Sequence, residues 1–144
     1  PVDLAALAEE AVMDVARAHD APGRVKLVFA DDIVAPVKRA ALKRCLVNLI
    51  DNALKYGKRA EVAVKRSGRL AELSVDDDGP GIAEDLREEA FRPFHRLDEG
   101  RNLQTGGVGL GLAIARDIAR AHGGDVRLEE SVLGGLRATI RLPV

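Results

Sequence analysis

The sequence is poor in cysteine and in aromatic residues. Of its 144 residues one is a cysteine, Cys45, 3% are aromatic, and none is tryptophan. A single thiol excludes a disulfide framework and a cysteine-based zinc site, and it is typical of a reducing compartment. The scarcity of aromatic rings disfavours a protein that binds nucleic-acid bases by stacking. No apolar run is long enough to span a bilayer, and we expect no signal peptide at Pro1-Val2-Asp3.

Net charge is nearly absent as well. Lys and Arg number 22 and Asp and Glu 23, so the formal net charge is −1. This balance disfavours a module held to nucleic acid or to a membrane surface by bulk charge, although a local basic patch is compatible with it. The 47% of apolar residues suffices for the core of one domain over residues 1–144. We expect a cytoplasmic domain and, since no methionine begins the chain, one cut from a longer protein; the sequence leaves open whether that parent is anchored in the inner membrane.

Hydrophobic periodicity predicts helices and strands in alternation. Asp3 is expected to be the N-cap of the first helix, and Gly57 to end the second. The predicted helices cover about 3–20, 37–56 and 110–121, with a short helical segment at 84–91, and the predicted strands cover about 25–30, 61–65, 70–77, 126–128 and 136–142. This pattern favours an α+β fold, a two-layer sandwich with one sheet and helices on one of its faces.

Two asparagines share one face of the predicted second helix. Asn48 and Asn52 lie four residues apart, and Lys55 follows them on the same face. Taken alone, an ordinary polar helix edge is the simpler interpretation. Asparagine is nevertheless a poor helix former, and amide oxygens beside an ammonium group suit Mg²⁺ and phosphate. A nucleotide-phosphate site is therefore plausible here but not specific.

A carboxylate follows the inward-facing residues of the strand at 70–77. Ala71, Leu73 and Val75 face inward, and Asp77 is next on that face. An ionised carboxylate there is costly unless it is hydrogen-bonded, so the alternative is that the strand has ended and Asp77 is a solvated turn residue. The sequence leaves these two interpretations balanced. A buried carboxylate would accept from an amine donor such as that of a purine, and the glycines after it permit close backbone approach.

A glycine-rich segment leads into the third predicted helix. Its sequence is Gly106-Gly107-Val108-Gly109-Leu110-Gly111-Leu112. Backbone N–H groups at a helix N-terminus can face phosphate oxygens, but a glycine run can equally be a flexible hinge. The segment lacks the preceding strand and downstream acid of a Rossmann fingerprint and the Gly-Lys-Ser/Thr ending of a P-loop. Both of these nucleotide-binding folds are therefore disfavoured.

Four segments together carry a family resemblance. Asn48-Leu-Ile-Asp-Asn52, Asp77-Asp-Gly79-Pro-Gly81, Phe91-Arg-Pro-Phe94 and Gly107-Val-Gly109-Leu-Gly111-Leu112 resemble, in order and spacing, the N, G1, F and G2 boxes of sensor histidine kinase catalytic domains, those of the osmosensor EnvZ class in particular. The resemblance covers nearly the whole chain. It implies the Bergerat fold of the GHKL ATPase superfamily, a mixed and mainly antiparallel sheet packed against three helices, with a flexible ATP lid at about residues 92–108.

The resemblance implies ATP and Mg²⁺ as cofactors. Asp77 would bind the adenine amino group, Tyr56 would pack over the nucleoside, and Asn52 would be the metal ligand. Asn48, Lys55 and Arg96 would be catalytic. The full implied nucleotide site comprises Asn48, Asn52, Lys55, Tyr56, Asp77, Gly79, Gly81, Ile82, Phe94, Gly107, Val108, Gly109, Leu110, Gly111 and Leu112. One departure is Gly134-Gly135-Leu136-Arg137, where many relatives have threonine close after Gly-x-Gly, which puts in doubt the support usually given there.

Position 48 separates branches of the superfamily. Relatives that hydrolyse ATP carry glutamate there as a general base, whereas Asn48 cannot take a proton at neutral pH. The resemblance therefore implies transfer of the γ-phosphoryl group to a histidine on a separate dimerisation domain, for relay to a response regulator receiver domain. No helical hairpin precedes His19, and neither His95 in the lid nor His122 at a helix end needs a chemical role. We expect the acceptor domain to be absent from this chain, which should bind ATP but autophosphorylate poorly.

Two other functions remain open. One is a stand-alone GHKL protein kinase of the anti-sigma type, and the other is a degenerate, non-catalytic interaction module. A hydrolase of the chaperone or repair type is disfavoured by Asn48. Neither nucleic acid nor direct membrane contact is expected of this domain.

Overall fold

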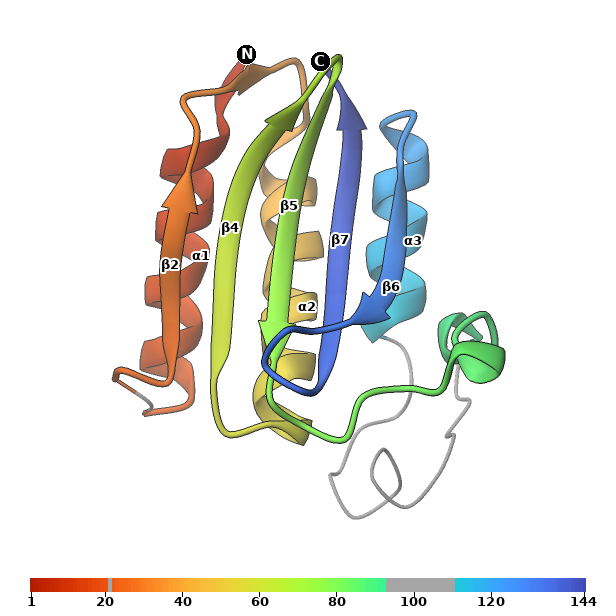
Figure 1. Ribbon diagram of the computed structural model, residues 1–144. Helices are drawn as coiled ribbons and strands as arrows, with labels where there is room; N and C mark the ends of the chain where they lie inside the picture. The colour runs from red at the N-terminus through yellow and green to blue at the C-terminus, as the bar shows by residue number, and fades with distance from the viewer. Residues whose placement is uncertain (21, 93–110) are drawn as a thin grey trace.

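The computed structural model describes residues 1–20, 22–92 and 111–144. These residues form two layers, with the helices packed together against one face of a sheet (Figure 1). The elements are β1 (Val2–Asp3), α1 (Leu4–Ala18), β2 (Val25–Ala30), β3 (Val34–Ala35), α2 (Arg39–Tyr56), β4 (Ala60–Ser67), β5 (Leu70–Asp77), the 3₁₀ turns η1 (Glu84–Leu86) and η2 (Glu89–Phe91), α3 (Gly111–Ala121), β6 (Asp125–Glu130) and β7 (Leu136–Pro143). In these described ranges, no helix is both long and apolar enough to cross a membrane.

The main sheet is mixed and mainly antiparallel. Its strand order within the described residues is β2-β4-β5-β7-β6, with β2 parallel to β4 and each of the other pairs antiparallel. The predicted two-layer α+β fold is thus confirmed. A second small sheet, in which β1 pairs with β3, was not predicted, because two-residue strands are too short to show an alternating pattern.

The local signals at the first helix act as predicted. The Asp3 side chain accepts a hydrogen bond from the backbone N–H of Ala6 at 3.2 Å, as an N-cap does. The buried face of α1 consists of Leu4, Leu7, Ala8, Ala11 and Val15, which recur at helical spacing. Burial of this stripe against the sheet and α2 holds the helix in the helical layer.

Strand β2 departs from the predicted alternation. Val25 is buried, but Phe29 is 49% exposed although the pattern places both on one face. The pairing of β2 with β4 shifts register between Leu27 and Phe29. After this shift the Phe29 side chain lies on the opposite face of the sheet from that predicted by simple alternation. The Phe29 ring lies on the open face, with the Lys65 Nζ 5.7 Å from its centroid.

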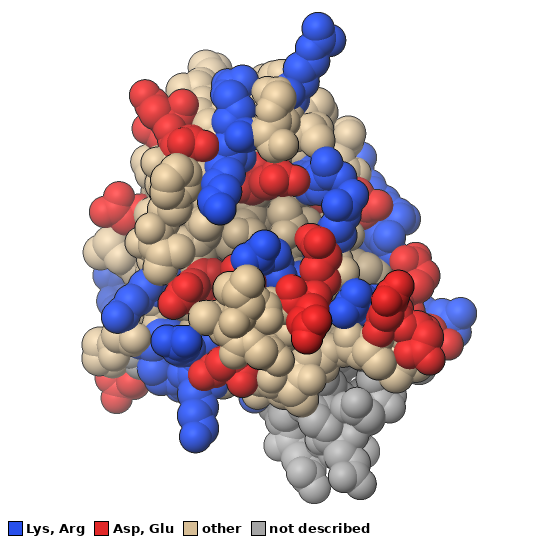
Figure 2. All heavy atoms as spheres, viewed as in Figure 1, with Lys and Arg blue, Asp and Glu red and all other residues tan. Residues whose placement is uncertain are grey.

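The open face of the sheet mixes charges of both signs (Figure 2). Cross-strand neighbours are paired there, with Arg141 Nε 3.1 Å from Glu72 and Arg137 Nε 2.8 Å from Asp76. Partly exposed ion pairs of this kind each contribute up to about 1 kcal/mol. This face is therefore a largely self-neutralised polar surface, and the apolar core lies on the other side of the sheet.

The buried Cys45 joins α2 to α3. Its thiol donates to the Ala115 carbonyl at 3.2 Å, and burial raises the pKa of the Cys45 thiol to about 12. The packing of α3 on α2 leaves Cys45 with no exposed surface.

We expect Cys45 to be unreactive toward a disulfide reagent at pH 8 until the chain unfolds. Above about pH 9 the unfolded chain loses this proton while the folded chain keeps it, so the folded state binds more protons and stability falls as pH rises. The decline is at most about 1.4 kcal/mol per pH unit up to about pH 12. Urea unfolding at pH 8 to 11, compared with Cys45→Ala, isolates this contribution. Rapid labelling at pH 8 without denaturant would contradict the burial.

Candidate nucleotide-binding site

The predicted site residues gather at one end of the two layers. The C-terminal ends of α2 and β5, the turn between β6 and β7 and the N-terminal end of α3 all lie at the lower end in Figure 1. Backbone packing ties these segments together, since a Cβ on Gly79 would lie 2.6 Å from the Tyr56 carbonyl oxygen and one on Gly111 would lie 3.9 Å from the Asn48 carbonyl oxygen. Residues from separate parts of the sequence thus surround one end of α2.

Asp77 is buried on the helix-facing side of the sheet. It is the last residue of β5, its exposed fraction is 2%, and the preceding inward residues, such as Val75, are buried too. The alternative of a solvated turn residue is therefore wrong. Its Oδ1 accepts the backbone N–H groups of Gly79 at 2.9 Å and Leu136 at 3.1 Å. These donors offset part of the cost of burying a carboxylate.

Gly135 makes the close approach to Asp77 possible. Its N–H donates to the Asp77 carbonyl at 3.1 Å, and a Cβ at this position would overlap Asp77 Oδ1 and lie 2.6 Å from the Gly79 nitrogen. The missing threonine after the glycines put in doubt the support that relatives have at this position. The structure shows that the main chain supplies support, through the N–H of Leu136. The glycine pair before Leu136 was the signal that could have identified it.

Arg24 fixes the C-terminal end of α2 by binding carbonyl groups of the last helical turn and of the two residues that follow the helix. Its Nε donates to the Lys58 carbonyl at 2.7 Å, and its Nη2 to those of Leu54 and Gly57, each at 3.3 Å. A cation at a helix C-terminus also complements the helix dipole. Sequence reasoning missed Arg24, since it lies far from α2 in the chain.

Asp78 holds the turn that follows α2. Its Oδ1 accepts the N–H groups of Lys58 at 2.7 Å and Arg59 at 3.1 Å. Burial raises the pKa of Asp78, but these hydrogen bonds outweigh it and hold that pKa below its ordinary value. Gly57 ends the helix as predicted, yet its φ of −114° is not left-handed. Glycine is needed there because a Cβ would lie 2.8 Å from Asp78 Oδ1.

The proposed phosphate side of the site lies on α2. Asn48 Nδ2 is buried and has no hydrogen-bond partner among the described residues, which costs about 1–3 kcal/mol for such a group. Asn48 is therefore a candidate donor to a ligand. Asn52 and Tyr56 are half-buried on the same helix, and Lys55 is exposed.

The turn after β5 lies on the side of the candidate site opposite the proposed phosphate side. Gly81 has a φ of +70°, a left-handed conformation that favours glycine, and a Cβ on it would lie 3.3 Å from the Gly135 carbonyl oxygen. Ile82 is buried beside it in the chain, as is Leu112 in the first turn of α3. Phe94, Arg96, Gly107, Val108, Gly109 and Leu110, with nearly all of the predicted lid, lie outside the described residues.

The described histidines have structural partners. His19 Nε2 lies 2.8 Å from Asp51 Oδ1. His122 Nε2 accepts the N–H of Lys38 at 3.1 Å, and its Nδ1 lies 2.8 Å from the Ile118 carbonyl oxygen. With Nε2 accepting from Lys38, the ring donates from Nδ1 to the Ile118 carbonyl, and no chemical role is needed to explain its position. Its role is to join the C-terminal end of α3 to the N-terminal end of α2.

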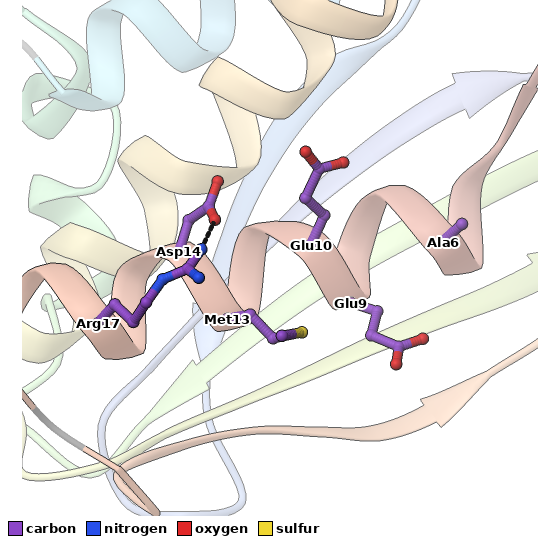
Figure 3. Close-up of a pocket in the computed structure, with 6 residues that line it drawn as sticks. All are labelled: Ala6, Glu9, Glu10, Met13, Asp14 and Arg17. Carbon is purple, nitrogen blue, oxygen red and sulfur yellow. Dashed lines mark hydrogen bonds and ion pairs between the residues drawn. The ribbon is translucent and has the colours of Figure 1, made fainter.

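A separate hollow lies on the outer face of α1 (Figure 3). Its lining residues, Ala6, Glu9, Glu10, Met13, Asp14 and Arg17, all project from α1 and include none of the predicted site residues. Lys43 bridges Glu10 and Asp14, so two of these carboxylates are already paired. The hollow does not contribute to the candidate site.

Comparison with known families identifies the class of this domain. Residues 37–144 match the family described as "Histidine kinase-, DNA gyrase B-, and HSP90-like ATPase". The chain belongs to this family and is an ATP-binding domain. The family predicted from the four motifs is thus confirmed.

The chain is similar to parts of known sensor kinases. It is 46% identical over 129 residues to sensor histidine kinase GtrS of Pseudomonas aeruginosa, an alignment that covers 90% of this chain and 26% of GtrS. It is 48% identical over 107 residues to sensor histidine kinase CpxA of Escherichia coli K12, covering 72% of this chain and 23% of CpxA. The chain thus spans about a quarter of the length of these relatives.

Solved structures show the same fold. The mycobacterial sensor histidine kinase MprB has a TM-score of 0.86 at 27% identity, covering 99% of this chain and 96% of that one. The histidine kinase domain of the Escherichia coli osmosensor EnvZ has a TM-score of 0.69 at 34% identity, covering 99% and 87%.

Proposed function

We propose that this domain supplies ATP to a two-component phosphorelay. In this proposal the γ-phosphoryl group passes to a histidine on a separate dimerisation domain of the parent kinase and then to a response regulator. The observation that carries the proposal is the buried Asp77, held by two backbone donors beside a helix that presents Asn48 and Asn52. The similarity to GtrS and CpxA supports it.

The adenine would bind at the β5 end of the site. The Asp77 carboxylate is an acceptor that suits the exocyclic amine of adenine and disfavours the carbonyl that guanine carries at the same position. Gly81, with its positive φ, would permit close backbone approach to the base, and Gly79 and Ile82 would line it. Tyr56 would pack over the nucleoside.

The phosphates would lie along α2 toward α3. Asn48 Nδ2, which has no partner in the described part of the chain, would donate to a phosphate oxygen, with the Lys55 ammonium nearby and Gly111 and Leu112 at the start of α3. Mg²⁺ would be held by Asn52 and phosphate oxygens, a donor set that fits the metal, and would neutralise charge on the transferring group. Within the described residues no group of three or more His, Cys, Asp and Glu side chains offers another metal site.

The side chains proposed to contact the phosphates favour transfer of the γ-phosphoryl group over hydrolysis of ATP. Asn48 has no titratable proton acceptor, so it cannot activate water as a general base. Lys55 and Arg96 would act by charge on the phosphates, which is how phosphoryl transfer is mostly catalysed. The attacking nucleophile would come from the dimerisation domain, and Phe94, Gly107, Val108, Gly109 and Leu110 would complete the nucleotide site.

Asn52→Ala tests the phosphate half of the proposal. We expect loss of the Mg²⁺ dependence of ATP binding and at least about a hundredfold slower phosphoryl transfer, on the order of 3 kcal/mol of barrier. The assay mixes the domain with a dimerisation hairpin that carries an acceptor histidine and follows radiolabel from ATP as acid-labile, base-stable phosphate. Glu9→Gln, in the α1 hollow, is the control and should behave as wild type.

Other outcomes separate the competing functions. Acid-stable label on serine or threonine of a partner protein would support the stand-alone kinase instead. Absence of ATP binding in two independent assays would leave a domain kept for protein contacts. Rapid ATP hydrolysis without any acceptor would contradict the role given to Asn48.

A further inference from the structure

A polar cluster lies directly behind the candidate adenine site, on the opposite face of the sheet. Asp76 precedes Asp77 in β5 and is 7% exposed. Its Oδ1 accepts the Ser131 hydroxyl at 2.7 Å and the Arg137 Nε at 2.8 Å. Asp76 and Arg137 are cross-strand partners. Their side chains form an ion pair, so the charge of the buried carboxylate is neutralised by the guanidinium.

Ser131 also organises the turn between β6 and β7. Its Oγ accepts the N–H of Leu133 at 3.0 Å, its carbonyl accepts that of Gly134 at 3.0 Å, and its own N–H donates to the Gly135 carbonyl at 2.8 Å. Three hydrogen bonds of Ser131 therefore close the turn, and the fourth, to Asp76, ties it to β5.

The far end of this turn is the part that touches Asp77. Gly135 donates to the Asp77 carbonyl and Leu136 to its Oδ1, each at 3.1 Å. Together with Gly79, Leu136 places two donors on one carboxylate oxygen. Two donors on Oδ1 restrict rotation of the carboxylate and so set the direction of Oδ2.

We propose that Ser131 and Arg137 are positioning residues for adenine recognition. By anchoring the β6–β7 turn to Asp76, they hold the Leu136 N–H where it orients the Asp77 carboxylate toward a purine amine. The inference rests on the proposed adenine-binding role of Asp77. It assigns a task to residues on the open face, which in this proposal would not contact the nucleotide.

The experiment compares two nucleotides that differ by the amine alone. ATP and the triphosphate of purine riboside, which lacks the 6-amino group, are titrated into wild type, Ser131→Ala and Arg137→Gln. Ser74→Ala is the matched control, since Ser74 lies on the same open face of β5, two residues before Asp76. Thermal unfolding of each variant confirms that it is folded at the temperature of the titration.

We expect Ser131→Ala and Arg137→Gln to lose about five- to tenfold in ATP affinity, the scale of one weakened hydrogen bond. Their affinity for purine riboside triphosphate should change less than about twofold, and Ser74→Ala should match wild type with both nucleotides. Equal losses of affinity for the two nucleotides, or no loss for either, would overturn the positioning role of Ser131 and Arg137. Such a result would leave the proposed adenine-binding role of Asp77 intact. A wild type that does not discriminate between the two nucleotides would overturn the adenine-binding role of Asp77 itself.

Discussion

Asp77→Asn should lower the affinity for ATP by about a hundredfold or more while the domain stays folded. The substitution removes a charge-assisted acceptor, which is worth about 1.5–3 kcal/mol. It also introduces a conflict, because the amide oxygen must face the N–H groups of Gly79 and Leu136. The amide NH₂ then points toward the adenine amine, and two donors oppose each other.

Calorimetric titration with ATP measures this loss, and Asp85→Asn, an exposed carboxylate in η1, is the control. The same argument predicts that Asp77→Asn discriminates less against a 6-oxo purine nucleotide than wild type does, since the amide NH₂ suits a carbonyl. An Asp77→Asn protein that binds ATP within about threefold of wild type would show that this carboxylate does not read the base.

Gly135→Ala should abolish measurable ATP binding and destabilise the domain by about 2 kcal/mol or more. A Cβ there would overlap Asp77 Oδ1 and lie 2.5 Å from the Asp77 carbonyl oxygen. One of these neighbours is backbone and the other is the buried carboxylate, so the strands must separate or the carboxylate must leave its position. Urea unfolding and ATP titration measure the two effects.

The neighbouring glycine provides a matched control. Gly134 has a φ of +98°, but a Cβ on it would meet nothing within 4 Å. Gly134→Ala should therefore lose about 1–2 kcal/mol from backbone strain while ATP affinity stays near wild type. If Gly135→Ala bound ATP as well as Gly134→Ala does, the close packing of the turn on Asp77 would not matter for the site.

The sequence predicted the helix ends and strand bounds that depend on residues close together in the chain. The Asp3 cap, the end of α2 at Gly57 and the bounds of β5 at Leu70–Asp77 all agree with the structure. The exposure of Phe29 could not be predicted, because it depends on a register shift against another strand. The hydrogen bond from the Lys38 N–H to His122 could not be predicted either, because the two residues lie far apart in the sequence.

The proposed ligand-binding residues of the candidate site could be predicted from the sequence, but the residues that support them could not. Asp77 stands out because a strand pattern predicts an apolar residue where a carboxylate occurs, and the asparagines of α2 stand out on one helix face. Their supporting residues do not stand out. Arg24, Ser131 and Leu136 reach the site only through helix packing and strand pairing, and two of them act through ordinary main-chain or hydroxyl hydrogen bonds.

The most direct test of the account is an amide NMR map of ATP binding to the ¹⁵N-labelled domain. The account predicts that ATP shifts the signals of Gly79, Gly81 and Leu136, of the Asn48–Tyr56 part of α2 and of the first turn of α3. The signals of the α1 hollow, Glu9 to Arg17, should not move. Shifts concentrated in that hollow or on the open face of the sheet, with those of Gly79 and Leu136 unchanged, would contradict a nucleotide site at the end of β5.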